Sequence, residues 1–268
     1  MLAATRRTRI AELLRGSRSV TVAELEREFG ISSMTARRDL AELERQGIAR
    51  RTHGGAVLPD IAAHEDSFTQ RLETATEAKE ALAEAALATI SEDETVLLDS
   101  STTSYFLARR IADSGIRLTL ITNSLPVMDL VATSPNPGIE LIGAGGSLRR
   151  LTRSFVGPVT VAAIRAHFAD RLFLSVKGIT ADGSLTDPDP LEAEVKRAMI
   201  AQAGEATLLV DASKLAVRGL SAISHVGELA RVIGYGFDSR EADRLRSAGA
   251  MLVPVGGDAG DDARGLRG

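Results

Sequence analysis

The stretch Ile31-Ser32-Ser33-Met34-Thr35-Ala36-Arg37-Arg38-Asp39-Leu40 combines hydroxyl side chains, two consecutive arginines and spaced apolar residues. Ser32 or Ser33 is suited to cap a helix that continues to about Gln46. At 3.6 residues per turn, Met34 or Thr35 faces inward together with Leu40 and Leu43. The residues left for the solvent side are Ser33, Thr35, Arg37 and Arg38.

An exposed helix of this kind has the chemistry that the major groove of DNA requires. Arginine can bond to guanine O6 and N7, and hydroxyls can bond to phosphates. The alternative is a solvated face on which Arg37 and Arg38 pair with Asp39, Glu42 or Glu44, which is the commoner arrangement for an arbitrary arginine pair. The residues upstream decide between these interpretations.

Two further helix signals precede this stretch. Ile10, Leu13 and Leu14 recur at helical spacing until Gly16, which predicts a first helix over residues 6–15. Thr21-Val22-Ala23-Glu24 matches a capping box and starts a short second helix. That helix ends near Gly30, because glycine readily adopts the left-handed conformation of a tight turn. Two helices joined to the arginine helix through a glycine turn favour DNA recognition.

A hairpin is predicted after Gly47. Residues 48–57 alternate in polarity and contain Gly54-Gly55. Arg50 and Arg51 can reach the sugar-phosphate backbone, whereas His53 is equally compatible with a phosphate contact and with an ordinary surface position. Residues 1–58 therefore read as a winged helix-turn-helix domain.

The charge distribution supports a basic head on an acidic body. Residues 1–58 hold 11 Arg and no Lys against 7 acidic residues, a net charge of +4, so the overall charge of −4 leaves −8 for the remainder. Such asymmetry favours nucleic acid as a partner of the head alone.

The head resembles the DNA-binding signature of the DeoR family of bacterial repressors. The resemblance rests on residues 31–40 and continues through Leu43-Glu44, Gly47, Arg50 and His53-Gly54-Gly55-Ala56. The family pattern usually has isoleucine or valine where this chain has Ala36. The resemblance implies that the DNA-contacting residues are Ser33, Thr35, Arg37, Arg38, Arg50, Arg51 and His53.

Residues 59–76 are predicted to form a linker, because Pro59-Asp60 breaks the hairpin and the polar stretch has little periodicity. Residues 77–90 have helical spacing and open a second domain. A coiled coil is the rival interpretation, disfavoured because no heptad persists. Phe68, Arg71 and Lys79 also resemble the connector of the DeoR family.

Residues 77–255 are predicted to form an α/β domain with a mainly parallel sheet, since short apolar strands alternate with helical segments. The expected strands are residues 95–98, 117–122, 139–142, 171–176, 207–210 and 231–234. The expected helices follow Thr103 and Leu125 and cover residues 158–167 and 191–202. Residues 256–268, rich in Gly, Asp and Arg, are predicted to be a disordered tail.

Polar residues follow three successive strands of this sheet, at the edge where open parallel sheets bind ligands. Residues 99–104, Asp-Ser-Ser-Thr-Thr-Ser, precede a helix and form a plausible phosphate cradle. Asn123 can reach sugar hydroxyls. Gly145 and Gly146 permit close backbone approach, and Arg149 adds charge.

Later loops add charged candidates with less specific patterns. Lys177 follows the fourth strand, and Asp211 and Lys214 end a further one. Glu192 and Lys196 are four residues apart and can simply stabilise their helix as a pair. For Glu194 and Lys196, a surface ion pair and a ligand site are equally good interpretations. For Asp211 and Lys214, a ligand site is the better one.

The body resembles the sugar-phosphate sensor domain of the DeoR family, which is similar in fold to phosphosugar isomerases and coenzyme A transferases. The ligand-site residues that the resemblance implies are Asp99, Ser100, Thr102, Thr103, Asn123, Gly145, Gly146, Lys177, Glu192 and Lys214. Ser101 stands where the family commonly has glycine, which narrows the cradle or adds a donor, and family members vary at Lys177.

These observations predict a DNA-binding transcriptional regulator, a repressor of sugar metabolism genes released by a phosphorylated sugar. Its expected partners are operator DNA, the effector and further copies of itself in a dimer or tetramer. We expect no cofactor, no metal site and no membrane span; the absence of cysteine and of a signal peptide fits the cytoplasm. The alternatives are a phosphosugar isomerase using Glu192 or Asp211 with Lys214, and an interaction module, which explains neither the hydroxyl loop nor the arginine helix.

Overall fold

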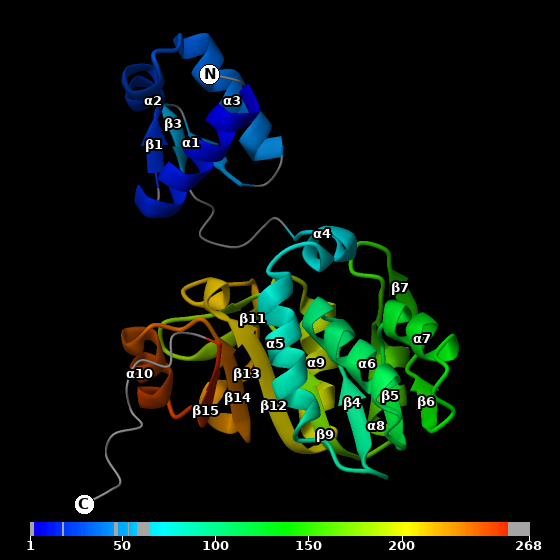
Figure 1. The fold of residues 1–268 in the computed structure, drawn as a ribbon. Coiled ribbons are helices and arrows are strands. Elements are labelled where there is room, and N and C mark those ends of the chain that lie inside the picture. The colour runs from blue at the N-terminus through cyan, green and yellow to red at the C-terminus, as the bar shows by residue number, and fades with distance from the viewer. Residues whose placement is uncertain (1–2, 18, 46–47, 53, 58–64, 257–268) are drawn as a thin grey trace, which may run out of the picture. The chain divides into compact units, whose positions relative to one another are not determined.

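The computed structural model describes residues 3–17, 19–45, 48–52, 54–57 and 65–256 of the 268 residues. Two compact units make up the chain, residues 1–65 and residues 66–268 (Figure 1). The division lies inside the predicted linker, so residues 66–76 belong to the second unit. Residues 58–64 and the tail from residue 257 lie outside the described residues.

Unit 1 has three helices and a three-stranded antiparallel sheet of order β1-β3-β2. Its elements are α1 (Ala3–Ser17), β1 (Ser19–Thr21), α2 (Val22–Phe29), α3 (Ser33–Arg45), β2 (Arg50–Thr52) and β3 (Gly55–Val57). The capping box is present: Thr21 Oγ1 accepts from the Glu24 backbone N–H, and the Glu24 carboxylate accepts from the Thr21 N–H. Gly30 has φ 61°, which confirms the left-handed turn before α3. β1 was not predicted and extends the wing to three strands.

The core of unit 1 corrects the predicted inward face of α3. Leu40 and Leu43 are buried as expected, but Met34 is 73% exposed. Ala36 is fully buried in its place, because its spacing of four residues from Leu40 and seven from Leu43 keeps all three on one stripe. A short side chain at this position lets α3 pack closely on α1 and α2.

Unit 2 begins with two helices that were partly missed. α4 (Phe68–Leu72) lies within the predicted linker and is capped by Ser67, and α5 (Thr76–Leu87) is the predicted helix. Phe68 is buried, packs edge-on against the Tyr105 ring at 5.6 Å between centroids, and donates its backbone N–H to the Leu151 carbonyl. The sequence did not predict α4, because a helix of five residues is too short to show a periodic pattern of apolar residues.

A seven-stranded sheet forms the centre of unit 2, and every strand pair in it is parallel. Its order is β15-β14-β12-β9-β4-β5-β6. The strands are β4 (Thr95–Leu98), β5 (Leu118–Thr122), β6 (Ile139–Gly143), β9 (Ala169–Leu174), β12 (Ala203–Asp211), β14 (Arg231–Tyr235) and β15 (Leu252–Val255). The predicted strands are confirmed to within a few residues, and β15 is additional.

Helices cover both faces of this sheet (Figure 1). Alternate residues of one strand point to opposite faces, so Leu98 joins one apolar cluster and Leu97 the other. α5, α6 (Thr102–Ser114) and α7 (Leu125–Ala132) pack on the first face. α8 (Pro158–Arg165), α9 (Pro190–Gln202) and α10 (Ser239–Ser247) pack on the second. The strands are therefore buried on both sides, as a parallel sheet requires.

Two antiparallel additions were not predicted. β7 (Ser147–Arg149) pairs with β8 (Ser154–Val156), and β10 (Gly178–Ile179), β11 (Ser184–Asp187) and β13 (Ser221–His225) form a small sheet. The short 3-10 helices η1 (Ala212–Lys214) and η2 (Val226–Glu228) flank β13. These strands are too short to show alternation in the sequence.

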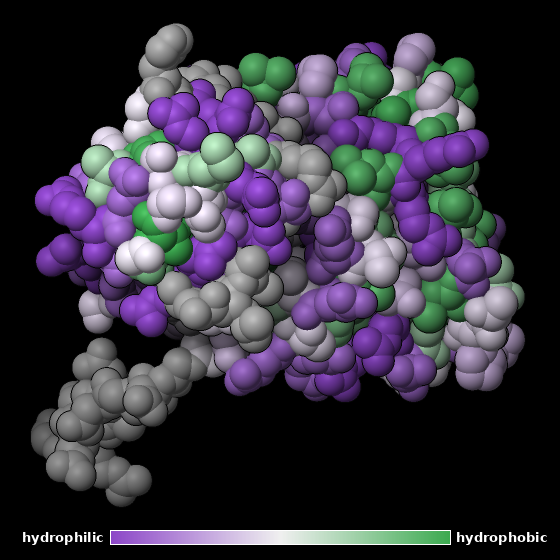
Figure 2. All heavy atoms as spheres, turned by 90° about the horizontal axis from the view of Figure 1, so that it is seen from above, coloured by the Kyte–Doolittle hydropathy of each residue, from purple (hydrophilic) through white to green (hydrophobic). Residues whose placement is uncertain are grey.

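The surface in Figure 2 shows hydrophilic and hydrophobic residues interspersed among the coloured residues of that face. The large exposed apolar side chains come from separate elements, among them Val159, Phe168, Leu220 and Met251. In the described part of the chain, no helix is long and apolar enough to cross a membrane.

Candidate functional sites

α3 exposes the predicted DNA-contacting side chains along one face. Ser33, Arg37 and Arg38 are exposed and Thr35 is half-buried. The first turn is ordered by Ser32, whose Oγ accepts from the Thr35 backbone N–H at 3.3 Å and lies 3.0 Å from Thr35 Oγ1. The helix therefore presents two guanidinium groups on a fixed scaffold.

Two of the acids proposed as partners for Arg37 and Arg38 pair with other residues. The Asp39 carboxylate is 2.6 Å from Arg6 Nε, and the Glu44 carboxylate is 2.9 Å from Arg51 Nε. Within the described residues, no hydrogen bond or ion pair involves Arg37 or Arg38. Their charge is thus directed at solvent, which is the arrangement that a nucleic-acid contact needs.

The wing carries the remaining predicted contacts. Arg51 on β2 is exposed, and besides its ion pair its backbone N–H donates to Glu44 Oε1 at 3.0 Å, which ties the wing to α3. Arg50 lies on the same strand, and His53 falls outside the described residues. The sequence allowed either Met34 or Thr35 to face inward, and Met34 was not counted among the contacts. It is exposed in the first turn of α3, where a thymine methyl group would be an apolar partner.

The predicted ligand residues of unit 2 gather at the carboxyl ends of neighbouring strands, as the parallel order requires. Asp99 follows β4, Asn123 follows β5, and Gly145 and Gly146 follow β6. Lys177 follows β9, Lys214 lies in η1 after β12, and Glu192 lies on α9. The structure therefore brings together residues that are up to 115 positions apart in the sequence.

A buried ionic network lies beneath this edge. The Lys196 ammonium is 3.3 Å from Asp99, 3.2 Å from Asp187 and 2.7 Å from the Ser175 carbonyl to which it donates. Burial disfavours its charge, but the carboxylates of Asp187 and Asp99 outweigh that effect and raise the pKa of Lys196. The surface ion pair considered for Lys196 is therefore wrong; the residue joins strand ends to α9.

Asp99 also fixes the loop after β4. Its Oδ1 accepts from the Ser101 N–H at 3.1 Å and from the Ser104 hydroxyl at 2.6 Å, while Oδ2 accepts from the Ser175 N–H at 3.2 Å. With Lys196 alongside, this carboxylate is fully engaged, and only 1% of the residue is exposed. Asp99 shapes the loop from within.

Glu192 organises the hydroxyls on the other side of the loop. Its carboxylate accepts from Ser154 at 2.5 Å, Thr152 at 2.9 Å and Ser100 at 3.3 Å. Arg149 lies 3.7 Å away and also pairs with Asp189 at 3.1 Å. Burial raises the pKa of Glu192, opposed by the bond from Ser154 and the charge of Lys196. Glu192 thereby fastens the β7-β8 hairpin to α9.

The phosphate cradle has a different inner geometry from that predicted. Ser101 Oγ caps α6 by accepting from the Ser104 N–H at 3.0 Å, so this amide is already occupied. Thr102 and Thr103 are 4% and 5% exposed. Their N–H groups stand in the first turn, where a helix has no internal acceptors to offer. Ser101, which stands where the family commonly has glycine, thus provides the N-cap of α6.

The loops after β5 and β6 differ in the groups that they offer to a ligand. Asn123 Nδ2 donates to the Phe155 carbonyl at 2.8 Å, but Asn123 Oδ1 and Ser124 Oγ are buried and have no hydrogen-bond partner. A side chain on Gly145 would meet no atom within 4 Å, whereas one on Gly146 would meet Thr160 Oγ1 at 2.1 Å. Gly145 faces free space, and Gly146 is needed for packing against α8.

Lys177 and Lys214 provide positive charge next to this edge. Lys177 Nζ is 3.6 Å from Asp66 Oδ2. Burial lowers the pKa of Lys214; Asp211 opposes this, and the charges of Lys177 and Arg71 add to it. A bound anion would offset the positive charges that disfavour protonation of Lys214.

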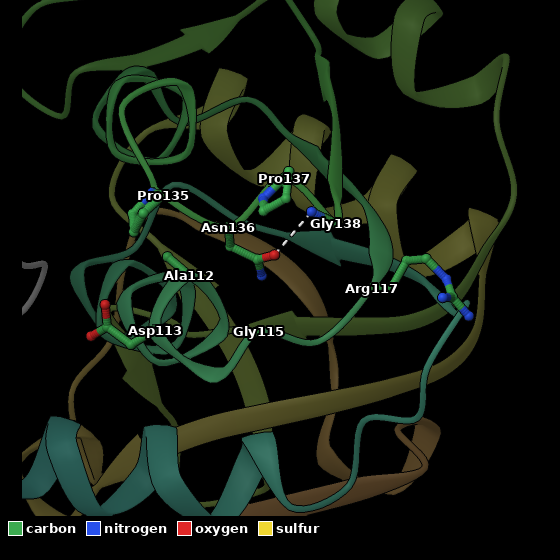
Figure 3. A pocket seen from close by; sticks show the side chains of 8 residues that line it. All are labelled: Ala112, Asp113, Gly115, Arg117, Pro135, Asn136, Pro137 and Gly138. Atoms are coloured by element: carbon green, nitrogen blue, oxygen red, sulfur yellow. Dashed lines mark hydrogen bonds between the residues drawn. The ribbon is translucent and has the colours of Figure 1, made fainter.

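A separate hollow of about 530 Å³ lies between the α6–β5 and α7–β6 turns (Figure 3). Its lining includes Asn136, which accepts from the Gly138 N–H at 2.9 Å and donates to the Ile116 carbonyl at 3.0 Å. Because these turns precede β5 and β6, the hollow is at the amino edge of the sheet. None of the predicted ligand residues line it, and Arg117 in its lining pairs with Glu92 and Asp93.

Comparison with known proteins gives consistent matches to both units. The DeoR-like helix-turn-helix domain matches residues 6–62, and the DeoR C terminal sensor domain matches residues 74–234. The HTH-type transcriptional regulator GlpR of Haloferax volcanii is 33% identical over 254 residues, covering 94% of this chain and 98% of the relative.

Two further relatives span most of the chain. The L-fucose operon activator of Escherichia coli is 32% identical and covers 86% of this chain and 94% of its own length. The HTH-type transcriptional repressor GlcR of Bacillus subtilis is 30% identical, with 94% and 96% covered. Among solved structures, ribose 5-phosphate isomerase A of Methanocaldococcus jannaschii is similar with a TM-score of 0.39 and 15% identity, over 52% of this chain and 54% of that one.

Proposed function

Since the chain belongs to the DeoR family of transcriptional regulators, we propose that it binds operator DNA through α3 and senses a phosphorylated sugar at the carboxyl edge of its sheet. The observation that carries the first half is the exposed, unpaired Arg37 and Arg38 on a capped helix-turn-helix. The second half is supported by the convergence of hydroxyl, amide and ammonium groups on one sheet edge.

In the DNA complex, Arg37 and Arg38 bond to guanine edges, and Met34 packs against a thymine methyl group. Ser33, Thr35, Arg50, Arg51 and His53 contact phosphates and set the register of α3 in the groove. Two copies related by symmetry place two such helices on one operator, so the active species is a homo-oligomer.

In the sensor unit, the proposed effector contacts separate into a rigid floor and open groups. The carboxylates of Asp99 and Glu192 are occupied by partners within the protein, the Ser100 hydroxyl donates to Glu192, and these three residues form the floor. The groups available to an effector are the first-turn amides of Thr102 and Thr103, the Asn123 carbonyl oxygen, the free space at Gly145, and the ammonium groups of Lys214 and of Lys177, the latter paired with Asp66 at 3.6 Å. The amides of Thr102 and Thr103 and the ammonium groups suit the anionic phosphoryl group, while the Asn123 side chain suits sugar hydroxyls.

We propose that the protein represses genes of sugar metabolism and is not an enzyme. The Bacillus subtilis relative is named a repressor and the Escherichia coli relative an activator, so the sign of control is tested directly with a reporter gene. An isomerase needs a carboxylate base facing substrate. Glu192 already accepts three hydroxyl hydrogen bonds and is 3% exposed, which leaves it poorly placed for that task.

The test begins with selection of a binding sequence from random DNA by the purified full chain. Fluorescence anisotropy on that sequence, repeated with a panel of sugar phosphates and the matching unphosphorylated sugars, is expected to show a change in Kd with one phosphorylated sugar. A change of five- to 150-fold corresponds to about 1–3 kcal/mol of coupling. No selected sequence, or steady turnover of a sugar phosphate, contradicts the proposal.

A further inference from the structure

Four cationic side chains meet where the chain enters unit 2. They are Arg71 on α4, Lys79 on α5, Lys177 after β9 and Lys214 after β12. The charges of Arg71 and Lys214 act on Lys79, and those of Lys177 and Arg71 act on Lys214. The acidic groups acting on Lys79 and Lys214 are Asp66 and Asp211. Four cations facing two carboxylates leave a formal excess of two positive charges, so the cluster attracts an anion such as a phosphate monoester, whose charge is about −1.5 to −2 at pH 7.

Arg71 is the member of this cluster with unmet hydrogen-bonding capacity. Its Nε and Nη2 atoms are buried and have no hydrogen-bond partner among the residues that the structure describes. An unsatisfied buried guanidinium is costly, and its planar donors match the oxygens of a phosphate. The position of Arg71 is set by the anchored Phe68 and by Lys79, whose ammonium donates to the carbonyls of Arg71 and Thr74.

The repulsion within the cluster is visible in Lys79. Burial lowers the pKa of Lys79 to about 8, and the charges of Lys214 and Arg71 add to this, against the effect of Asp211. Asp211 is partly occupied, because its Oδ1 accepts from the Ser213 N–H at 2.9 Å. Asp66 is the more exposed of the two carboxylates, with 44% of its side chain exposed.

Asp66 has the chemistry and the location of an internal substitute for the effector. Its Oδ2 is 3.6 Å from Lys177 Nζ, and it also acts on Lys214. It is the first residue of unit 2, directly after the residues that lead from the DNA-binding unit. Because the ion pair is partly exposed and long, solvent screens it and its loss costs little free energy.

On the basis of the proposed function, we propose that Arg71, Lys177 and Lys214 bind the phosphoryl group of the effector and that Asp66 holds this place until the phosphoryl group displaces it. Displacement releases the residue with which unit 2 begins, next in sequence to the DNA-binding unit. Effector and DNA are thereby coupled through Asp66, and the coupling is reciprocal.

Inorganic phosphate is a sufficient probe, because the cluster recognises the phosphoryl group alone. Its Kd is measured by 31P NMR and by thermal shift on the full chain, with chloride at equal ionic strength as reference. Asp66→Asn removes the competing charge and is expected to lower the phosphate Kd about five- to twentyfold, whereas Arg71→Gln raises it at least tenfold and Arg71→Lys recovers part of the loss. Asp243→Asn and Arg240→Gln make the same charge changes on exposed α10 and leave the Kd unchanged.

Binding to the selected DNA gives a second readout. Asp66→Asn without phosphate is expected to shift the DNA Kd in the direction in which phosphate shifts it for the wild type, and added phosphate then has less than half its former effect. An unchanged phosphate Kd in Asp66→Asn overturns the role of Asp66, and an unchanged one in Arg71→Gln overturns the role of Arg71. Absence of phosphate binding in both wild type and Asp66→Asn overturns the proposal as a whole. A response of DNA binding to sugar phosphates that survives these results leaves the proposed function standing.

Discussion

Arg37 and Arg38 on α3 extend into solvent, whereas Glu192 and Lys196 on α9 are 3% and 6% exposed and surrounded by partners. Both pairs are charged residues on helices, but the first pair is exposed and the second is buried. The arginines of α3 are available to a ligand and contribute little to the fold. The charges of α9 are committed to the fold and shape a site they do not need to touch. Substitution of the α3 arginines should therefore reduce DNA binding and leave stability unchanged. Substitution of the buried charges on α9 should instead reduce stability.

The largest expected effect is in the buried network of unit 2. Lys196→Met leaves Asp99 and Asp187 buried without their cation, which is expected to cost about 3–5 kcal/mol of unfolding free energy. Urea denaturation followed by circular dichroism measures this loss. Glu194→Gln, an exposed change on the same helix, should stay within about 0.5 kcal/mol. A similar small loss in both variants would show that the network does not stabilise the fold.

The second effect appears in binding and not in stability. Replacing Arg37 and Arg38 together by alanine is expected to weaken binding to the selected DNA by about 2–4 kcal/mol, or some 30- to 1000-fold. The unfolding free energy should change by less than about 0.5 kcal/mol, because both side chains are exposed. Arg240→Ala on α10 is the control. Undiminished DNA affinity in the double variant removes α3 as the reader.

Asp39→Asn tests a residue of α3 that resembles those of α9. Asp39 is 2% exposed and pairs with Arg6 at 2.6 Å, so loss of the charge is expected to destabilise unit 1 by about 1–3 kcal/mol. DNA affinity should fall only when unit 1 is partly unfolded, and cooling should restore it. A loss of DNA affinity at full folding would instead assign Asp39 to the interface.

The smallest effect is a dependence on pH at Lys79. Its pKa is about 8 in the folded protein and near 10.5 when unfolded, so between these values the unfolded chain binds more protons. Stability relative to Lys79→Met should therefore rise as pH increases from 8 to 10.5, by about 1–2 kcal/mol. Paired denaturation curves of the two proteins measure the difference. A difference that falls over this range contradicts a depressed pKa.

Much of the architecture was predictable because it depends on local patterns. The Thr21 to Glu24 capping box and the apolar strands each carry a signal within a few residues, and their order predicts the edge where Asp99 and Asn123 meet. The direction of Met34 was not predictable, since Met34 and Ala36 both fit an apolar stripe and only packing against α1 and α2 selects the smaller residue.

The charges of the sensor unit show the limit of sequence patterns more clearly. Lys196 looked like a surface residue because its partner Asp99 lies 97 positions earlier. Arg71 Nε and Nη2 and Asn123 Oδ1 are buried and lack hydrogen-bond partners among the described residues. This, too, can be recognised only when the surrounding tertiary structure is known. Which polar groups are satisfied is a property of tertiary contacts, and residue identity alone does not contain it.

The order of strands in the central sheet has a consequence for protein synthesis. β4 lies between β5 and β9, β9 pairs in turn with β12, and β14 and β15 extend the sheet beyond β12, so the sheet is not complete before residue 255 has been made. The core of unit 1 is complete at Ala56. At the usual translation rate of about 5–20 residues per second, the stretch between these two points takes roughly 10–40 s. During each round of synthesis, the DNA-reading unit is therefore finished well before the unit that controls it.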